Sequence, residues 1–403
     1  MDIPPPKELI GRLQRLPAGR TLLERIPARD GVFLVGGAVR DLLLGLGPPE
    51  LDVVVEGDAI SLARELGGLV LAYDRFGTCK VRLDAHTYDI ATARTETYAR
   101  PGALPDVAPA PLTEDLKRRD FTVNAIAMAL GGGREGMLEA LPGALEDLQA
   151  RTLRVLHDRS FIDDPTRLLR LARYAGRLSF AVEPHTRDLV QAAVRAGALE
   201  TVSGARIGAE LRLLAREREP LEAFAALHEL RVDGAIHPRF GLRDRAPVKR
   251  ALRLLPPDGR SDLLVLAAAA EEVPREELAG LLDGLAFEAA DRERVVSAAA
   301  GAKILAAALK RAHTPADIAA AAAGASPELV ALAGGHGSVD AAAAWLDELR
   351  HVRLEIDGQD LLAAGVPQGP LIGRALRAAL EAKLDGRASG REAELSEALQ
   401  AVR

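Results

Sequence analysis

The sequence predicts an α+β fold in which a small mixed sheet near the N-terminus is followed by an all-helical arm. Before residue 150, short β-branched runs alternate with glycine and proline, which is typical of strands in a sheet. After residue 150, apolar residues recur at helical spacing, and the last third is rich in alanine, a strong helix former. We therefore expect a sheet domain at 1–150 and helical domains at 151–215, 216–300 and 301–403.

The composition is that of an ordinary folded protein and excludes several classes. Of the 403 residues, 48% are hydrophobic and 27% are charged, which does not fit a disordered chain. No apolar run approaches the roughly 18 residues of a membrane span, and the first residues lack the basic-then-apolar layout of a secretory signal. A single cysteine, Cys79, excludes an internal disulfide and a multi-thiolate metal site. We expect a cytoplasmic protein with no membrane partner.

The pattern before residue 150 predicts individual strands and helices. Four β-branched runs bounded by glycine or charged residues are expected as strands, and two segments have helical spacing. The strands are expected at 31–37, 50–57, 77–83 and 86–93, and the helices at 38–45 and 59–66. Residues 101–111 hold four prolines, so we expect an extended, semi-rigid surface loop there.

A pair of glycines, Gly36 and Gly37, stands where the first strand should pass into a helix. Glycines at such a turn allow the backbone to approach a ligand closely, and the N-terminus of a helix favours phosphate. Arg40 lies in the first turn of that helix, where its guanidinium can reach the same anion. The alternative is an ordinary glycine turn, as found in many α/β proteins.

Acidic residues follow at a spacing that suits divalent metal ions. Glu50 and Asp52 lie two apart in a predicted strand, so both project from one face while the apolar residues that alternate with them point to the core. Two carboxylates at this spacing can share divalent metal ions, as phosphoryl-transfer sites require. Asp89, on a neighbouring predicted strand, is a candidate third carboxylate. The alternative is a set of solvent-facing acids on exposed strands.

The segment EDLKRRDFTVNAIAM combines arginines with carboxylate and amide groups. Arg118 and Arg119 provide guanidinium groups for phosphates, and Asp120 and Asn124 can hydrogen-bond a sugar. From Phe121 onward the apolar residues predict a helix. In the alternative interpretation Asp120 only caps that helix and the arginines form a solvated face.

The segment FIDDPTRLLRLARYAGRLSF carries a stripe of arginines. Asp164 precedes a proline, which predicts an N-cap followed by proline at the first helical position. Arg167, Arg170, Arg173 and Arg177 then recur every three or four residues, on one side of the helix. The net charge of −6 gives no overall attraction for nucleic acid, so any such partner needs a local basic surface of this kind. Asp164 and Arg167 can also present an acceptor and a donor side by side to the edge of a base.

These segments, in this order, resemble the class II tRNA nucleotidyltransferase and poly(A) polymerase family of the polymerase-β superfamily. The resemblance is carried by LVGGAVRDLLLG, ELDVVVEGDA, DLKRRDFTVNAIAM and DDPTRLLRLARYAGRLSF, which cover much of residues 30–180. Weaker matches are RIGAEL, at 206–211, and IDGQDLLAAGVPQGPLIGRAL in the C-terminal segment. The resemblance implies a polymerase-β-like nucleotidyltransferase head at 1–150, a neck with a base-reading helix, a body and a tRNA-binding tail.

The resemblance also implies roles for individual residues. The nucleotide-binding set comprises Gly36, Gly37 and Arg40 at the triphosphate, Arg118, Asp120 and Asn124 along the nucleotide, and Asp163, Asp164, Arg167, Arg170 and Arg173 around the helix that reads the base. The catalytic carboxylates are Glu50, Asp52 and Asp89, of which Glu50 and Asp52 hold two Mg²⁺ ions. Arg206 and Glu210 support the base-reading helix.

Two positions depart from the family pattern. The first metal-binding position usually carries Asp, and here it is Glu50. A longer side chain can shift a metal by about 1 Å, and such a displacement can cost on the order of 10²-fold in rate. Asp163 stands where many members carry Glu, which is a mild change. Because the wider superfamily tolerates either acid at the metal positions, we expect activity.

The implied reaction is template-independent addition of CMP and AMP, from CTP and ATP, to the 3′ end of tRNA. Addition of CC alone, addition of the terminal A alone and poly(A) polymerase action remain alternatives, because the switch from C to A depends on a loop, here 90–117, that contains the proline-rich run. A catalytically silent RNA-binding homologue is a further alternative, supported by Glu50 and the acidic net charge. The sequence has no Walker-type phosphate loop, dinucleotide fingerprint or helical metalloprotease motif. No protein partner is identifiable.

Overall fold

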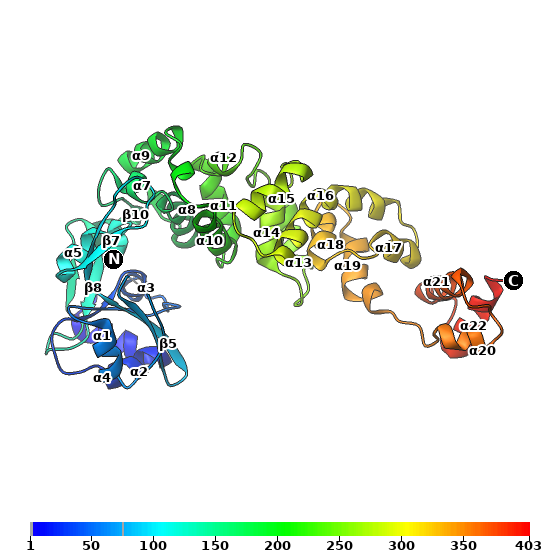
Figure 1. The fold of residues 1–403 in the computed structure, drawn as a ribbon, viewed down its shortest axis with the longest axis horizontal. Coiled ribbons are helices and arrows are strands. Elements are labelled where there is room, and N and C mark those ends of the chain that lie inside the picture. Colours follow the sequence, from blue (N-terminus) through cyan, green and yellow to red (C-terminus); the bar gives the residue numbers. More distant parts are fainter. Residues whose placement is uncertain (1–2, 75) are drawn as a thin grey trace. The chain divides into compact units, whose positions relative to one another are not determined.

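The computed structural model describes residues 3–74 and 76–403, which form two compact units (Figure 1). The first unit contains the chain up to Ser203 and the short segment Glu229–Ala235, and the second contains Gly204–His228 and Ile236–Arg403. The roughly 50 residues that follow position 150 therefore belong to the same unit as the sheet. The finer division at 150, 215 and 300 stays a prediction.

A seven-stranded mixed sheet forms the framework of the first unit in the described part of the chain. Its strands lie in the order β3-β4-β5-β2-β1-β8-β9. β2 and β5 are parallel, and the other neighbouring strands are antiparallel. The strands are β1 (Val32–Val35), β2 (Asp52–Val55), β3 (Leu69–Tyr73), β4 (Thr78–Leu83), β5 (His86–Thr92), β8 (Ile126–Ala129) and β9 (Leu138–Ala140).

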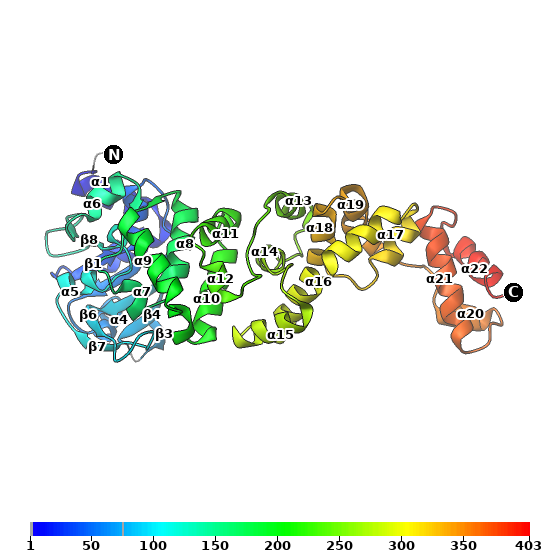
Figure 2. The ribbon, with the colours of Figure 1, turned by 90° about the horizontal axis from the view of Figure 1, so that it is seen from above.

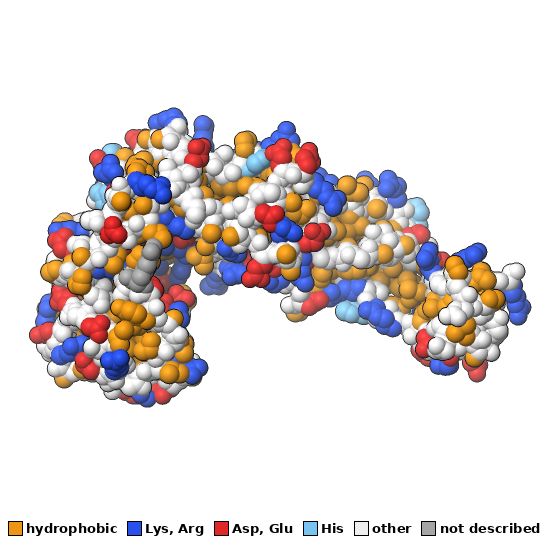
Figure 3. All heavy atoms as spheres, in the orientation of Figure 1, with side chains coloured by type: hydrophobic (Ala, Val, Ile, Leu, Met, Phe, Trp, Pro, Cys, Tyr) orange, Lys and Arg blue, Asp and Glu red, His pale blue; other side chains and the backbone are white. Residues whose placement is uncertain are grey.

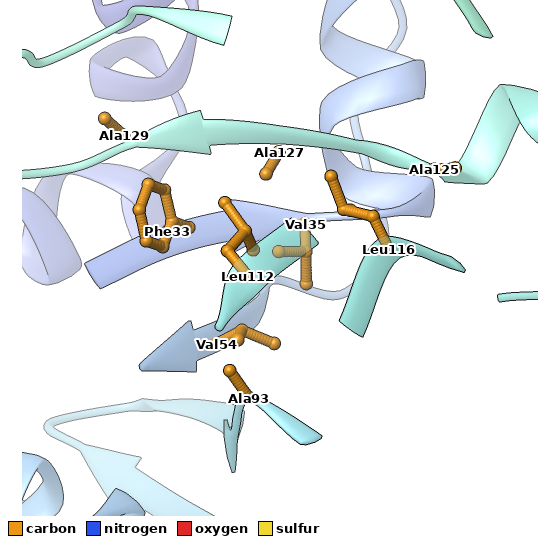
Figure 4. Close-up of a cluster of buried hydrophobic side chains, with 9 residues drawn as sticks. All are labelled: Phe33, Val35, Val54, Ala93, Leu112, Leu116, Ala125, Ala127 and Ala129. Atoms are coloured by element: carbon orange, nitrogen blue, oxygen red, sulfur yellow. The ribbon is translucent and has the colours of Figure 1, made fainter. Parts of the chain in front are cut away.

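The central strands are buried on both faces of this sheet. On one face, Phe33, Val35 and Val54 pack against Leu112 and Leu116 of α5 (Leu112–Lys117), as Figure 4 shows. The alternate residues of β1 and β2, which point to the opposite face, are buried as well. Burial on both faces explains why these strands are continuous apolar runs. The face of β2 that was predicted to be exposed is therefore accessible only at its first residue, Asp52, because Val54 on the same face packs against α5.

The predicted strands and helices before residue 93 are confirmed, and α3 (Gly37–Leu43) and α4 (Ala59–Glu65) occupy the two helical segments. The predicted helix after Phe121 is wrong. A 3-10 turn at Thr122–Asn124 leads into β8, whose four residues are all buried, so the alternation that signals a strand is missing.

The proline-rich loop also contains an unpredicted strand. β7 (Asp106–Pro109) pairs in antiparallel fashion with β6 (Arg94–Thr97) in a separate two-stranded ribbon. Pro109 lies opposite Arg94, at the end of this ribbon, where a missing backbone N–H is tolerated.

The chain directly after residue 150 forms a short parallel pair of strands, β10 (Thr152–Leu153) and β11 (Ala181–Val182). Between them run α7 (Ser160–Asp163) and α8 (Arg167–Leu178). The other helical segments up to residue 203 are α1 (Pro6–Arg15), α2 (Pro17–Arg25), α6 (Ala144–Gln149), α9 (Pro184–Arg195) and a 3-10 turn at Ala198–Thr201.

The remaining described residues are helical, as predicted. α14 is apolar nearly throughout and is buried on all sides, which marks it as a core helix. The three C-terminal helices, drawn in orange to red in Figure 2, enclose their own apolar cluster around Leu361 and Ala379. The helices are α10 (Gly204–Ala215), α11 (Pro220–Glu229), α12 (Asp233–Ile236), α13 (Ala246–Leu254), α14 (Ser261–Ala269), α15 (Arg275–Gly284), α16 (Ala289–Arg311), α17 (Pro315–Ala321), α18 (Pro327–Gly335), α19 (Val339–Asp347), α20 (Gly358–Ala363), α21 (Pro370–Leu384) and α22 (Arg391–Gln400), with a 3-10 turn at Leu349–His351. Across the described ranges, none of the helices combines the length and the apolar character that crossing a membrane requires.

Candidate functional site

A polar pocket with a volume of about 270 Å³ lies in the first unit, beside the turn between β1 and α3. Most of the predicted nucleotide-binding residues line it, although they come from distant parts of the sequence. The lining residues are Gly36, Gly37, Asp52, Glu96, Tyr98, Arg118, Arg119, Asp120, Asn124, Asp164, Arg167, Arg170 and Tyr174.

The glycine turn forms one wall of the pocket. Gly36 has a φ of 65°, in the left-handed region that favours glycine. A Cβ atom at this position would lie 2.6 Å from Nη1 of Arg119. Gly36 therefore leaves room for the Arg119 guanidinium at the turn where β1 passes into α3.

Arg40 occupies a different place from the predicted one. Its side chain is 1% exposed, and it donates hydrogen bonds to Asp41 at 2.7 Å and 2.9 Å and to Oδ1 of Asn124 at 2.6 Å. The guanidinium also lies over the Tyr174 ring, 5.2 Å from its centre. Arg40 thus faces the interior and contacts two residues that line the pocket, Asn124 and Tyr174. The expected contact with a triphosphate does not follow from this arrangement.

Asp52 and Asp89 are direct neighbours on the parallel strands β2 and β5. Such neighbours project to the same face with their backbones about 4.8 Å apart. Burial raises the pKa of Asp52 to about 6, and the charge of Asp89 adds to the rise, while Arg119 opposes it. Nζ of Lys80, on β4, lies 3.1 Å from Asp89. The two carboxylates lie side by side on neighbouring strands, where a divalent cation could bind both.

Glu50 lies outside strand β2, so the prediction that it alternates with Asp52 within one strand is wrong, whereas its metal-binding role stays a prediction. β2 begins at Asp52, and Glu50 lies in the preceding bend, where it is exposed and does not line the pocket. Its charge nevertheless contributes to the raised pKa of Asp52. Within residues 3–74 and 76–403, no three His, Cys, Asp or Glu side chains are grouped so as to hold a metal ion alone. Mg²⁺ is usually held by one or two carboxylates together with substrate phosphates, and the oxygen donors of Asp52 and Asp89 fit that requirement.

Arg118 and Arg119 are fixed at the pocket by a carboxylate behind them. The fully buried Asp115 accepts hydrogen bonds from Arg118 at 2.7 Å and 2.9 Å and from Arg119 at 2.9 Å. Arg118 also donates to Glu96 at 2.8 Å. Burial alone would raise the pKa of Asp115, but the two arginines outweigh it and lower the pKa. The carboxylate therefore stays ionised and holds both guanidinium groups in place.

Asp120 and Asn124 form a bonded pair at the back of the pocket. Nδ2 of Asn124 donates to Oδ1 of Asp120 at 2.9 Å, and Arg170 donates to Oδ2 at 2.6 Å and 2.9 Å. Burial would raise the pKa of Asp120, but Arg170 and Asn124 outweigh it and lower the pKa far below its usual range. An ionised Asp120 therefore ties α8 to the segment that follows α5.

Asp164 and Arg167 share one wall of the pocket, as predicted. α8 begins at Arg167 rather than at the proline, and Asp164 caps the preceding turn by accepting from the backbone N–H and hydroxyl of Thr166, at 3.2 Å and 2.6 Å. Arg167 donates to Oγ of Ser160 at 2.7 Å and to the backbone carbonyl of Arg118 at 2.6 Å. An acceptor and a donor are thus held next to each other at the pocket.

The arginine stripe of α8 faces the interior of the first unit more than solvent, which corrects the prediction of a free basic surface. Arg170 is bound to Asp120 as described, and Arg177 donates to the buried Asp41 at 2.8 Å. The guanidinium of Arg173 lies 4.9 Å from the centre of the Tyr174 ring. The stripe therefore serves mainly to anchor α8.

Other predicted residues lie outside the pocket. Asp163 forms an ion pair with Arg159 at 2.9 Å on the outer side of α7. Arg206 and Glu210 lie on α10, in the second unit, and their support of the base-reading helix stays a prediction.

Three pocket residues are not predicted by the sequence: Glu96, Tyr98 and Tyr174. Arg119 is expected from the residues, together with Arg118, as a group for phosphates, although the resemblance assigns it no role. Tyr98 donates its hydroxyl to Glu96 at 2.9 Å, but Glu96 lies in β6 and Tyr98 directly after it, in a stretch that carries no motif that points to a ligand. Tyr174 has the spacing of the buried apolar residues of α8, so the sequence does not distinguish it from a core residue.

The surface charge gives no further guide to the site. On the visible face of the first unit, basic and acidic side chains are interspersed (Figure 3). Arg118 and Arg119 at the pocket are two arginines that could bind an anion. Paired carboxylates on β2 and β5, a glycine turn before a helix and fixed arginines beside them define the class of nucleotidyl-transferring enzymes, which need groups for a divalent cation and for a triphosphate.

Comparison with known proteins narrows this class. The family model of the poly(A) polymerase head domain matches residues 32–154. The chain is 34% identical over 395 residues to the A-adding tRNA nucleotidyltransferase of Geobacter sulfurreducens, covering 90% of this chain and 44% of that protein. It is 38% identical over 238 residues to the CC-adding enzyme of Deinococcus radiodurans, covering 56% of this chain and 62% of that protein.

A solved structure agrees with these sequence matches. The CCA-adding enzyme of Thermotoga maritima, complexed with tRNA, matches with a TM-score of 0.78 and 27% identity over 100% of both chains. The chain belongs to the family of class II tRNA nucleotidyltransferases and poly(A) polymerases. It spans less than two thirds of the length of the two curated relatives described above.

Proposed function

We propose that this protein is a cytoplasmic tRNA nucleotidyltransferase that adds CMP and AMP to the 3′ end of tRNA, with CTP and ATP as substrates. The observation that carries the proposal is a pocket at which Asp52, a glycine turn, fixed arginines and the Asp164–Arg167 pair converge, with Asp89 beside Asp52 on the neighbouring strand. The relatives named for addition of A and of CC, and the neighbour complexed with tRNA, support the class of substrate.

In this proposal the arginines bind the triphosphate and the acids prepare the site for Mg²⁺. Arg118 and Arg119 bind phosphate oxygens as preorganised donors, because Asp115 already fixes their orientation. Asp52 and Asp89 hold Mg²⁺, and Glu50 takes part from the bend before β2. Bound Mg²⁺ supplies charge neutralisation at the phosphates and favours ionisation of the attacking hydroxyl.

The reaction is a direct displacement. The oxygen of the tRNA 3′-hydroxyl forms a bond to the α-phosphorus, the bond from that phosphorus to the bridging oxygen breaks, and pyrophosphate leaves with the electron pair. The pocket contributes position and fixed charge, and it requires no covalent intermediate with the protein.

Base selection follows from the donor and acceptor on one wall. The carboxylate of Asp164 accepts from an exocyclic amine, which cytosine and adenine both possess. Arg167 donates to a ring acceptor that is also present in both bases. On the Watson–Crick edge the ring nitrogen of uracil and of guanine carries a hydrogen and cannot accept, so the pair gives a physical basis for selection of CTP and ATP without a template strand.

Narrower activities are the second candidates. The relative that matches over 90% of this chain is named for addition of A alone, and the Deinococcus relative for addition of CC alone. Poly(A) polymerase action would extend an RNA with many adenosines. A silent RNA-binding homologue is disfavoured by the adjacent carboxylates of Asp52 and Asp89, which are suited to a divalent cation.

The test is incorporation of labelled CTP and ATP, with Mg²⁺, into three tRNAs: one lacking CCA, one ending in CC and one mature. Addition of CC and then A to the first tRNA would establish the full activity. Addition of CC alone to the first, or of A alone to the second, would establish a partial enzyme. Long adenosine tracts would indicate poly(A) polymerase, and no incorporation despite tRNA binding would contradict the proposal.

A further inference from the structure

Each of the two side chains assigned to base reading is held by the hydroxyl group of a neighbouring residue. Oγ of Ser160 accepts a hydrogen bond from Nη1 of Arg167 at 2.7 Å. The hydroxyl of Thr166 donates to Oδ1 of Asp164 at 2.6 Å. Ser160 is 0% exposed and Thr166 is 5% exposed, so bulk water does not compete for either bond.

These bonds fix orientation as well as position. The guanidinium of Arg167 is rigid and planar, and it has a second anchor, because Nη2 donates to the backbone carbonyl of Arg118 at 2.6 Å. Two anchors on different nitrogens define the plane of the group. Without Oγ of Ser160, the guanidinium could pivot about the remaining bond.

The same logic applies to the acceptor. Thr166 holds one carboxylate oxygen of Asp164 with both its backbone N–H and its hydroxyl. The hydroxyl bond is the shorter of the two, at 2.6 Å against 3.2 Å, and it is charge-assisted. Removing the hydroxyl takes away the shorter of these two bonds.

We propose that Ser160 and Thr166 are specificity-determining positioning residues. Neither lines the pocket among the described residues, so both act through Arg167 and Asp164. By fixing a donor and an acceptor relative to each other, they match the pattern that cytosine and adenine share. If the Asp164 carboxylate or the Arg167 guanidinium can move, it can also adjust to the wrong base. Loss of either hydroxyl therefore reduces discrimination between bases. This inference rests on the proposed function, because it takes Asp164 and Arg167 as the groups that face the base.

Nearly isosteric variants test the inference. Ser160→Ala and Thr166→Val each remove one hydroxyl with little change in shape, and Thr166→Ser restores the hydroxyl without the methyl group. The matched control is Thr186→Val. Thr186 is 0% exposed, and its hydroxyl oxygen accepts from the backbone N–H of Val155 at 3.2 Å, away from the pocket lining.

Two readouts are needed for each protein. The first is the dissociation constant of CTP, ATP, UTP and GTP, measured by calorimetry with Mg²⁺. The second is kcat and KM for each nucleotide on a tRNA that lacks CCA. Because a hydrogen bond to a charged group corresponds to about a tenfold factor or more, we expect Ser160→Ala and Thr166→Val to reduce the preference for CTP over UTP about tenfold. Thr166→Ser and Thr186→Val should keep the preference of the unaltered protein.

The outcomes separate this inference from the proposed function. If the unaltered protein incorporates no nucleotide, the proposed function fails, whereas the ratio of dissociation constants still tests the inference. An unchanged CTP-to-UTP ratio in folded Ser160→Ala and Thr166→Val proteins would overturn it. A loss of preference in Thr186→Val as large as in Thr166→Val, or no preference in the unaltered protein, would overturn it as well.

Discussion

The carboxylate of Asp120 accepts two hydrogen bonds from Arg170, at 2.6 Å and 2.9 Å, across 50 positions of sequence. The other oxygen of the carboxylate accepts from Asn124, which in turn accepts from Arg40. A continuous polar network thus joins α3, the turn before β8 and α8. Arg40, Asp120 and Asn124 of this network are buried, and through them it ties the walls of the pocket together.

This network predicts a structural role for Arg40. Arg40→Ala leaves Oδ1 of Asn124 without its donor and removes one of the two arginines bound to the buried Asp41. Breaking such a buried pair costs about 3 kcal/mol, so we expect a loss of that size in the free energy of unfolding, measured in urea. The exposed Arg195 of α9 supplies the control, Arg195→Ala, which should change stability little. A rise in the KM for nucleotide with unchanged stability would instead assign Arg40 to the triphosphate.

Alanine variants at two glycines should be similarly strained but should differ in activity. Gly36 and Gly133 have φ values of 65° and 75°, so alanine at either position strains the backbone by about 1 kcal/mol. Only at Gly36 would the new Cβ meet a neighbour, Nη1 of Arg119 at 2.6 Å, whereas nothing lies within 4 Å at Gly133. We expect Gly36→Ala to lower kcat/KM about 10²-fold through displacement of Arg119. Gly133→Ala should lose similar stability and keep its activity, and equal activities in the two variants would refute the assignment.

The carboxylate pair predicts a pH dependence of stability in the absence of metal. The pKa of Asp52 is raised from 3.8 to about 6, so the folded state binds a proton more tightly than the unfolded state. The stabilisation is complete below about pH 4 and is lost as the pH rises through about 6. Unfolding in urea with a chelator should therefore show a free energy that falls over this interval. Asp52→Asn should abolish this component, and a profile identical to that of the unaltered protein would contradict the assignment.

Glu96 predicts an effect on nucleotide affinity. Its carboxylate accepts from Arg118 at 2.8 Å and offsets part of the positive charge that a triphosphate would meet. Glu96→Gln removes this charge but keeps an acceptor, so we expect nucleotides to bind about threefold to tenfold more tightly at low salt. Glu114→Gln, at an exposed pair with Lys117, is the control for a change in net charge. Equal affinities in the two variants would argue against a role of Glu96 at the phosphates.

Local patterns predicted much of the fold and of the site. Four strands and two helices before residue 93 follow from β-branched runs and helical spacing, whereas α1, α2 and β3 were not predicted. The pocket gathers most of the nucleotide-binding residues that the resemblance implied. The failures come from tertiary burial. β8 is covered on both faces, so its AIAMA run lacks the alternation of a half-exposed strand and was taken for a helix.

The roles of charged residues were harder to predict, because a charge pattern does not reveal its partners. Arg40 is bound to Asn124, 84 positions away, and Arg177 to Asp41, 136 positions away. The sequence therefore indicated ligand-binding arginines at positions where the fold uses buried anchors. Glu50 was misplaced for a simpler reason, since β2 begins two residues later than the apolar run suggested.

The most direct test of the central claim is to compare the unaltered protein with Asp52→Asn in nucleotide addition to a tRNA that lacks CCA. With Mg²⁺ and labelled CTP and ATP, we expect the unaltered protein to extend the tRNA and Asp52→Asn to be at least about 10³-fold slower with tRNA binding retained, because the variant loses several kcal/mol of charge stabilisation. Asp84→Asn, at an exposed pair with Arg25, should match the unaltered protein. Extension at an unchanged rate by Asp52→Asn would contradict the account, because the pocket would then not be the site of nucleotidyl transfer.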